Sequence, residues 1–356
     1  MIMAAIRSTN LELFRIFLMV VLIMPTHYIM SGGIINMVDP SNLTFNMYIA
    51  EVFSRTGRMG NNCFLLITGY FMCTMDFSWR KFWRLVLQVE FYAVVIYLLF
   101  VLFKYEAFSL IGFSSYVLTI LYGVGTEFVG TFVALYILSP FINKLINSLT
   151  EKEFKKLLLL LIFFFSVCNS MFGRVFEMLG WYITVYLVGA CLRKCPPQFL
   201  EGRKKVSVFL IGNIILVFGS IILITCISQY KEGLLRFVQM SIQQSNHLLS
   251  LTCATAFFLF FKSVKVPYNS IINKLATTIL GVLCIHEHSA TMHHLLYRDI
   301  FCVKANSQDP GFLLYMFGCI IVLFLVCAVI DLLRVRFLEK PFFTLVYDKI
   351  IERNQK

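Results

Sequence analysis

The chain has 356 residues, of which 59% are hydrophobic and only 14% are charged, and its formal net charge is +12. Apolar stretches that can cross a bilayer recur from residue 11 to residue 337, since about 20 apolar residues cover the hydrocarbon core. This pattern indicates an all-α, polytopic integral membrane protein. The positive charge is distributed over the connections between these stretches, which argues against a nucleic-acid-binding surface.

Ten apolar segments are predicted to span the membrane. In chain order they cover residues 11–30, 61–75, 82–103, 127–142, 156–171, 181–192, 206–227, 247–261, 275–290 and 311–335. If both termini lie on one side, that side carries 22 of the 31 Lys and Arg residues, eight lie on the other side, and Arg15 lies within the first span. Because cytoplasmic loops of membrane proteins carry an excess of Lys and Arg, both termini are predicted to be cytoplasmic.

The connections predicted to face outward are the longest, at about residues 31–60, 104–126, 228–246 and 291–310. No linker, low-complexity tract or soluble domain interrupts the predicted spans. We therefore expect a single membrane-embedded domain over residues 1–356.

Charged side chains within a span are costly, so they usually face an interior cavity or a partner. The first span carries Glu12, Arg15 and His27. Glu12 and Arg15 are three residues apart on one helix face and can pair near the cytoplasmic edge, as can Asp331 and Arg334 in the last span. His27 lies about 18 Å further along the first helix than Arg15 and has no local partner.

A basic cluster opens the third predicted span, where Arg80, Lys81 and Arg84 lie beside Trp79. Anchoring at the cytoplasmic interface explains this cluster fully. The fork geometry of arginine would also suit a phosphate-rich cytoplasmic ligand. Glu127, at the outer start of the fourth span, is an acidic candidate on the opposite side.

The ninth predicted span ends with His286, Glu287 and His288. Adjacent residues project from different faces of a helix, so His286 and Glu287 can line one surface only if the helix ends there. Two histidines at i and i+2 lie on opposite sides of a helix, and the cysteines lack zinc or redox spacing, so no metal site is predicted. His293 and His294 follow in the outer connection and are expected to be solvated.

Five segments, taken in order, resemble a known family. They are residues 10–15 followed by 27–28, then 60–71, 81–84, 135–143, and 272–274 followed by 281–286. Together they resemble the motifs of the acyltransferase-3 family of integral membrane O-acyltransferases, especially its capsule and surface-polysaccharide O-acetyltransferase branch. The resemblance extends through nearly the whole length of the chain.

The resemblance implies transfer of an acetyl group from cytoplasmic acetyl-CoA to a hydroxyl of an extracytoplasmic sugar or surface polysaccharide. Acetyl-CoA would be a co-substrate, and no bound cofactor is expected. The expected partners are the lipid bilayer and a polysaccharide or lipid-linked sugar acceptor, with no nucleic acid. The expected location is a bacterial plasma (inner) membrane, which the protein would cross many times.

Roles for individual residues follow from the same resemblance. A neutral imidazole suits the removal of a proton from a sugar hydroxyl, so His27 would be the general base or a transient acetyl carrier. Three basic residues would bind the acyl donor, and three residues would form or support the acceptor side. The donor set is Arg15, Lys81 and Arg84, and the acceptor set is His286, Glu287 and Glu127.

One spacing departs from the family pattern. The family usually places the first-span Arg and His eleven positions apart, which at 100° per residue leaves them within about 20° of one face. Here Arg15 and His27 are twelve positions apart, which in a regular helix would rotate His27 by roughly 120°. Pro25 removes a helical hydrogen bond and can host a kink, and a π-type bulge would absorb the extra residue.

Two other functions remain open from the sequence. The charged residues could line the path of an exporter of a polysaccharide or lipid-linked sugar, although no convincing internal repeat of the transporter kind is present. The altered Arg–His spacing also leaves an inactive scaffold of a polysaccharide assembly complex as an alternative. Modification that depends on acetyl-CoA would distinguish the enzyme from both.

Overall fold

The computed structural model describes residues 8–39, 42–122, 127–168, 178–228, 230 and 244–347. Every regular element in these ranges is a helix, so the predicted all-α class is confirmed. Five helices are long and apolar enough to cross a membrane: Thr9–Ser31, Trp79–Leu102, Phe128–Ser148, Arg203–Ser228 and Phe312–Leu345. They coincide with the first, third, fourth, seventh and tenth predicted spans. The total of ten spans and the side on which the termini lie stay predictions.

The other predicted spans also coincide with helices, most of them short or partly polar. These are α3 (Phe45–Met72), α8 (Glu151–Ile162), α10 (Met178–Lys194), α13 (Leu248–Ser263), α14 (Ser270–Ala276) and α15 (Ile279–His286). The helix of the second predicted span begins earlier than residue 61, at Phe45, within the stretch 31–60 predicted to be an outer connection. Glu51 and Arg55 lower the hydropathy of this segment, yet they form an ion pair with side-chain exposures of 0% and 2%. Pairing at i,i+4 allows both charges to be buried in the helix.

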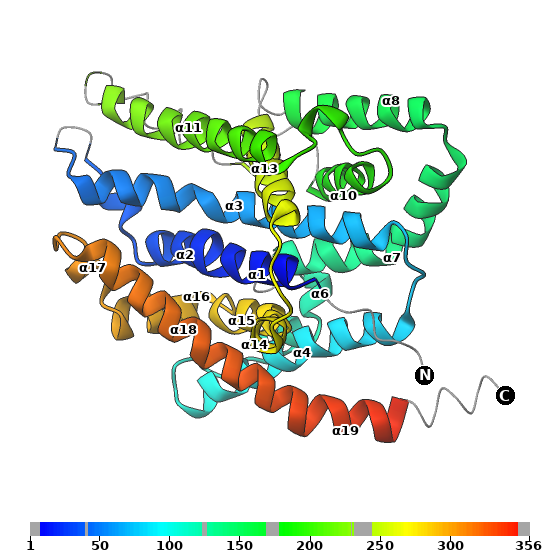
Figure 1. Ribbon diagram of the computed structural model, residues 1–356. Coiled ribbons are helices and arrows are strands. Elements are labelled where there is room, and N and C mark those ends of the chain that lie inside the picture. Colours follow the sequence, from blue (N-terminus) through cyan, green and yellow to red (C-terminus); the bar gives the residue numbers. More distant parts are fainter. Residues whose placement is uncertain are drawn as a thin grey trace.

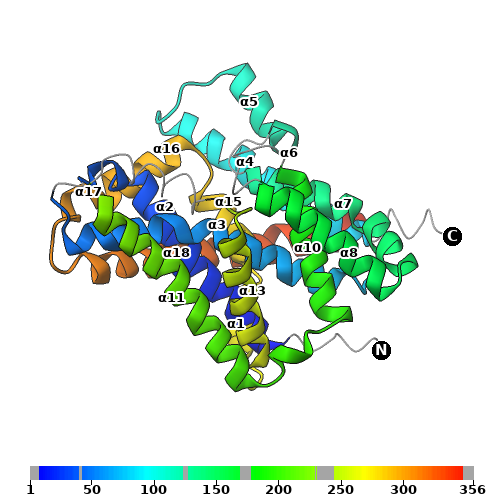
Figure 2. The same cartoon turned by 90° about the horizontal axis from the view of Figure 1, so that it is seen from above.

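The middle of the molecule contains α3 and the first span, which runs from α1 (Thr9–Phe17) through η1 (Leu18–Ile23) to α2 (Met24–Ser31). Figures 1 and 2 show α11 (Arg203–Ser228) and α13 on one side of this pair. On the other side lie α15, α4 (Trp79–Leu102) and α18 (Phe312–Arg334). The first span is therefore enclosed by helices from both halves of the sequence.

Two apolar clusters flank the first span. Leu18 and Leu22 belong to the cluster shared with α3, α10, α11 and α13. Met19 and Ile23 belong to the other cluster, which is shared with α4, α15 and α18. Because both faces of this helix are packed, its rotation about its axis is closely determined, and so is the direction in which its polar side chains point.

The helices α3 and α10 cross with their backbones in close approach. A Cβ added to Gly69 would overlap the backbone carbonyl of Tyr186, and one added to Gly189 would overlap the carbonyl of Leu66. Small residues at helix contacts allow backbones to approach closely within a membrane. Outward-facing residues of α11 and α18 are large and apolar, for example Val208 at 70% exposure. Such a surface is the one that lipid tails require.

Candidate active site

The first span contains the π-helical turn that the altered spacing requires. The π-helix η1 lies between Arg15 and His27, and Pro25 is the second residue of the following α2. A π-type insertion lengthens the chain by one residue without advancing the helix face, so the twelve steps act as about eleven. His27 thus returns to within about 20° of the face that carries Arg15. The π-type alternative is confirmed.

The second helix of the site ends where its two polar residues occur. The helical residues of α15 run from Ile279 to His286, and Glu287 has already left helical geometry with φ −104° and ψ 17°. This change of direction lets adjacent side chains reach one surface, which a continuous helix would prevent. The sequence predicted that His286 and Glu287 could line one surface only if the helix ended there, and the helix does end at His286.

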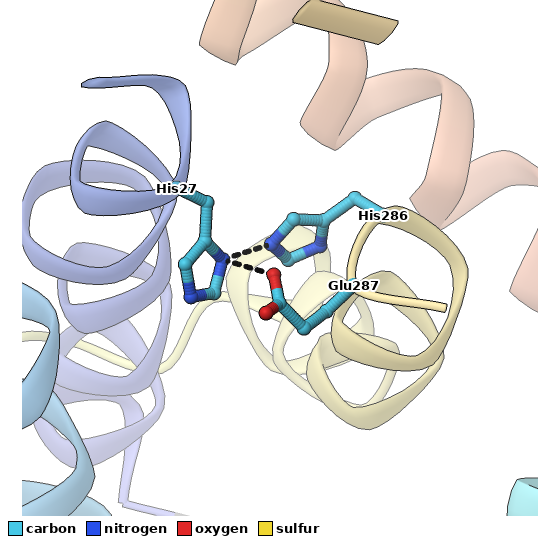
Figure 3. Close-up of side chains that lie close together, drawn as sticks. All are labelled: His27, His286 and Glu287. Carbon is cyan, nitrogen blue, oxygen red and sulfur yellow. Dashed lines mark hydrogen bonds and ion pairs between the residues drawn. The ribbon is translucent and has the colours of Figure 1, made fainter. Parts of the chain in front are cut away.

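His27, His286 and Glu287 meet in one cluster (Figure 3). The Nδ1 atom of His27 lies 2.8 Å from Oε2 of Glu287 and 3.0 Å from Nε2 of His286. The His286 side chain is fully buried, whereas those of His27 and Glu287 are 21% and 16% exposed. The structure therefore brings one predicted catalytic residue into contact with two predicted acceptor-side residues.

The hydrogen bonds of this cluster assign the tautomers of both rings. Nδ1 of His286 lies 2.6 Å from the carbonyl oxygen of Val282, which can only accept, so Nδ1 carries the proton. Nε2 of His286 is then an acceptor, as is the carboxylate of Glu287. His27 must donate to both from Nδ1, and its Nε2 atom has a free lone pair.

A further histidine, His293, completes the surroundings of the carboxylate. Its Nε2 atom lies 3.1 Å from Oε2 of Glu287, and its side chain is 24% exposed. The expectation that His293 is solvated was wrong, because the chain turns back after α15 into α16 (Ala290–His293). The neighbouring His294 is 57% exposed and pairs with Asp299, as expected of an outer residue. No periodicity in the sequence could have separated the two histidines.

Comparison with known proteins now identifies the chain. The family model described as an acyltransferase domain matches residues 8–332, which include all of α1 through α15 and nearly all of α18. The chain belongs to the acyltransferase-3 family. No curated protein and no solved structure matches the chain. The resemblance stated from five sequence segments is confirmed, and the protein is a membrane acyltransferase.

Two of the three residues predicted to bind the acyl donor have separate acidic partners in this acyltransferase. Arg15 lies 3.4 Å from Glu12, which confirms the predicted pair. Arg84 is paired with Glu339, and Lys81 is exposed in the first turn of α4.

Arg84 joins a largely buried polar network at the end of α18. Glu339 contacts Arg84 and lies 2.8 Å from Arg334, whose Nε atom is 2.9 Å from Asp331. The hydroxyl of Tyr92 on α4 donates to Asp331 at 2.8 Å. The predicted Asp331–Arg334 pair is confirmed, and it links the start of α4 to the end of α18.

A second basic group of the acyltransferase was missed from the sequence. Arg193 donates to the hydroxyl of Tyr70 at 3.0 Å, and its guanidinium lies 4.9 Å from the centre of the same ring. The ammonium of Lys262 is also 4.9 Å from that ring centre. Basic residues from two predicted cytoplasmic connections therefore converge on the end of α3, which only the packing of α10 and α13 against α3 could reveal.

The remaining predicted acceptor-side residue is Glu127. It is the first residue of α7 (Glu127–Ser148), but its side chain lies outside the part of the chain that the structure describes. Of the predicted acceptor set, His286 and Glu287 therefore lie in the cluster around His27, which also contains the unexpected His293.

Proposed function

We propose that this acyltransferase transfers an acetyl group from cytoplasmic acetyl-CoA to a hydroxyl of an extracytoplasmic sugar or surface polysaccharide. The observation that carries the proposal is the hydrogen-bonded pair of His27 and Glu287, 2.8 Å apart, with its tautomer held by His286. The pattern of basic residues along the chain supports the assignment of sides, since it places His27 toward the outer half of the first span.

The proposed reaction begins at Nε2 of His27. This atom removes the proton from the acceptor hydroxyl as the hydroxyl oxygen attacks the thioester carbonyl of acetyl-CoA. The new carbon–oxygen ester bond forms, the carbon–sulfur bond breaks, and the proton on His27 passes to the departing thiolate of CoA. His27 thereby returns to its starting tautomer.

Glu287 and His286 act on His27 rather than on the substrate. When Nε2 takes up the proton the ring becomes positively charged, and the carboxylate of Glu287 stabilises that charge through a charge-assisted hydrogen bond. His286 keeps Nδ1 of His27 as the donor because its own Nδ1 proton is bound to Val282. The same tautomer would serve a two-step route in which Nε2 of His27 carries the acetyl group.

Cations at the predicted cytoplasmic end are proposed to hold the phosphates of the acyl donor. Arg15, Lys81 and Arg84 are the residues that the family resemblance assigns to this role, and the group around Tyr70 adds Arg193. Arg84 would have to exchange Glu339 for a phosphate, since the two side chains are paired. Bidentate contacts of arginine with phosphate favour such an exchange.

The test measures O-acetylation of the host's surface polysaccharide by NMR in wild type, His27→Ala, His27→Gln and a gene deletion. Loss of the O-acetyl signals in both His27 variants and in the deletion, with polymer amount unchanged, is the expected result. His294→Gln is the matched control, because it removes an exposed imidazole of the same region. Acetylation that persists in His27→Gln would contradict the role of His27 as the base. Loss of the polymer itself in the deletion would indicate that the protein is an exporter.

The same variants are compared in isolated membranes supplied with radiolabelled acetyl-CoA and the polysaccharide. Transfer of label by wild type and by His294→Gln, but not by His27→Gln, is expected. Absence of label transfer by wild-type membranes would contradict the proposed donor. This second readout separates an enzyme from a scaffold that only supports another acetylating protein.

A further inference from the structure

The cluster around His27 has the donor atoms of a transition-metal site. One ligand atom each from His27, His286 and Glu287 lie within 4.8 Å of one another. We propose that these three side chains bind Zn²⁺, and that the bound ion inhibits the acyltransferase. The inhibitory effect rests on the proposed role of His27 as the base, whereas binding of the ion does not.

The spacing of the donor atoms fits a tetrahedral ion. Bonds of about 2.0–2.1 Å from zinc to nitrogen and oxygen place neighbouring tetrahedral ligands roughly 3.3 Å apart. Nδ1 of His27 lies 2.8 Å from Oε2 of Glu287 and 3.0 Å from Nε2 of His286. His27 needs to separate from each of the other two ligands by only a few tenths of an ångström, and the three ligand atoms all lie within 4.8 Å of one another. A fourth position is left for water. Two histidines and one glutamate are an established ligand set for zinc with an open position.

The outer contacts of the cluster resemble those that orient metal ligands. His286 donates its Nδ1 proton to the carbonyl of Val282, which turns the lone pair of Nε2 toward the cluster. His293 donates to the carboxylate of Glu287. Ligating histidines commonly donate their other N–H to a carbonyl, and ligating carboxylates are themselves hydrogen-bonded. These contacts thus hold two of the three ligands before any ion binds.

Access and ligand chemistry favour zinc over the common hard cations. The side chains of His27 and Glu287 are 21% and 16% exposed, so the cluster is not sealed inside the protein. Imidazole nitrogen suits zinc and copper, whereas Mg²⁺ and Ca²⁺ prefer a shell of oxygen atoms. Two neutral imidazoles and one carboxylate together carry a single negative charge, which suits a divalent cation.

Binding of the ion would change the tautomer on which catalysis depends. Zinc takes the lone pair of Nδ1 of His27, so that Nδ1 can no longer carry a proton. The ring proton moves through solvent to Nε2, and the total number of protons on the ring stays the same. Nε2 then donates instead of accepting, and it cannot remove a proton from an acceptor hydroxyl. Inhibition follows without any change in the fold.

Sequence spacing could not predict this site. His288, two residues after His286, points elsewhere, with Nε2 2.9 Å from the carbonyl of Ala93. The prediction that His286 and His288 do not form a zinc pair therefore agrees with their separate surroundings. The ligands instead come from α2, from the last residue of α15 and from the residue that follows it.

The first experiment measures binding of Zn²⁺ alone to the full-length protein in detergent, after removal of metals with a chelator. Competition with a fluorescent zinc chelator is expected to reveal one high-affinity site in wild type. His286→Gln and Glu287→Gln are expected to weaken it at least tenfold, and His293→Gln by about 10- to 100-fold through lost orientation of the carboxylate. His294→Gln and Cys302→Ser remove exposed potential ligands outside the cluster and serve as controls.

Retention of folding in each variant is checked by its thermal unfolding midpoint. Because a variant could still be altered locally, Co²⁺ replaces Zn²⁺ in wild-type protein as a second measurement. Visible absorption bands of tetrahedral Co²⁺ that Zn²⁺ abolishes are expected. Zinc affinity that is unchanged in both His286→Gln and Glu287→Gln, or Co²⁺ spectra of an octahedral ion, would overturn the site.

The second experiment measures acetyl transfer with increasing Zn²⁺, with Mg²⁺ as the control ion. Inhibition by Zn²⁺ at its measured binding affinity, reversed by chelator, is expected. Activation by Zn²⁺ would contradict the inhibitory role. Because binding is measured without turnover, zinc can bind as proposed even if the acetyl-transfer proposal fails, and the reverse also holds.

Discussion

Replacing the carboxylate of Glu287 by an amide tests the proposed catalytic pair most directly. Glu287→Gln keeps the size of the side chain and removes its charge. His27 and His293 both donate to the same oxygen of Glu287, at 2.8 Å and 3.1 Å. The amide oxygen of the variant is therefore expected to remain at that position, and the tautomer of His27 should persist.

The expected loss of kcat in Glu287→Gln follows from the lost charge alone. A hydrogen bond to a charged group contributes about 1.5–3 kcal/mol, and a neutral bond contributes less. Loss of this stabilisation when His27 becomes positively charged should lower kcat by about 10- to 100-fold, since each 1.4 kcal/mol corresponds to about a factor of ten. The KM for acetyl-CoA should change little, because the interaction strengthens only as the proton is transferred.

The assay measures initial rates of acetyl transfer in isolated membranes over a range of acetyl-CoA concentrations. His294→Gln provides the matched change from a charged or polar side chain to an amide at an exposed position. A kcat of Glu287→Gln within twofold of wild type would refute the reasoning, as would a loss found entirely in KM. Equal amounts of folded protein are verified by size-exclusion chromatography.

Four other changes test the helices that hold the site. Deleting Val21 from η1 should retain most activity, because the first span can then become a regular α-helix with the same face toward the cluster. Inserting one alanine after Val21 should instead lower activity more than tenfold, because it turns His27 by about 100°. Gly69→Ala should lower the thermal unfolding midpoint, since overpacking costs about 1–3 kcal/mol. Asp331→Asn should destabilise the protein by about 3 kcal/mol, because it breaks a buried ion pair.

Each of these changes has a control or a contrary outcome. Gly212→Ala adds a Cβ that meets no other segment of the described chain within 4 Å, so its midpoint should match wild type. An equal loss in both glycine variants would contradict the close crossing. Asp76→Asn changes an exposed carboxylate and should be neutral. If the deletion and the insertion at η1 reduce activity equally, the π-helical turn does not set the direction of His27.

Much of the architecture could be predicted because apolar runs in a membrane protein must form helices. With no water to bond the backbone, an apolar stretch such as residues 206–227 satisfies its own N–H and C=O groups as α11. The position of His27 in the first span and its resemblance to a family motif likewise required only local information. The beginning of α3 was missed because hydropathy treats Glu51 and Arg55 as exposed, whereas they neutralise each other within the helix.

The sequence by itself determined the helical class, the membership of the acyltransferase-3 family and the candidate residues on each helix. Only the tertiary structure decided which of those residues meet. The end of α15 at His286, the π-helical turn before His27 and the return of the chain to His293 together bring the site into one place, although His27 and His286 are 259 positions apart in the chain. Local periodicity describes one helix at a time, and a site built from two helices requires their relative positions.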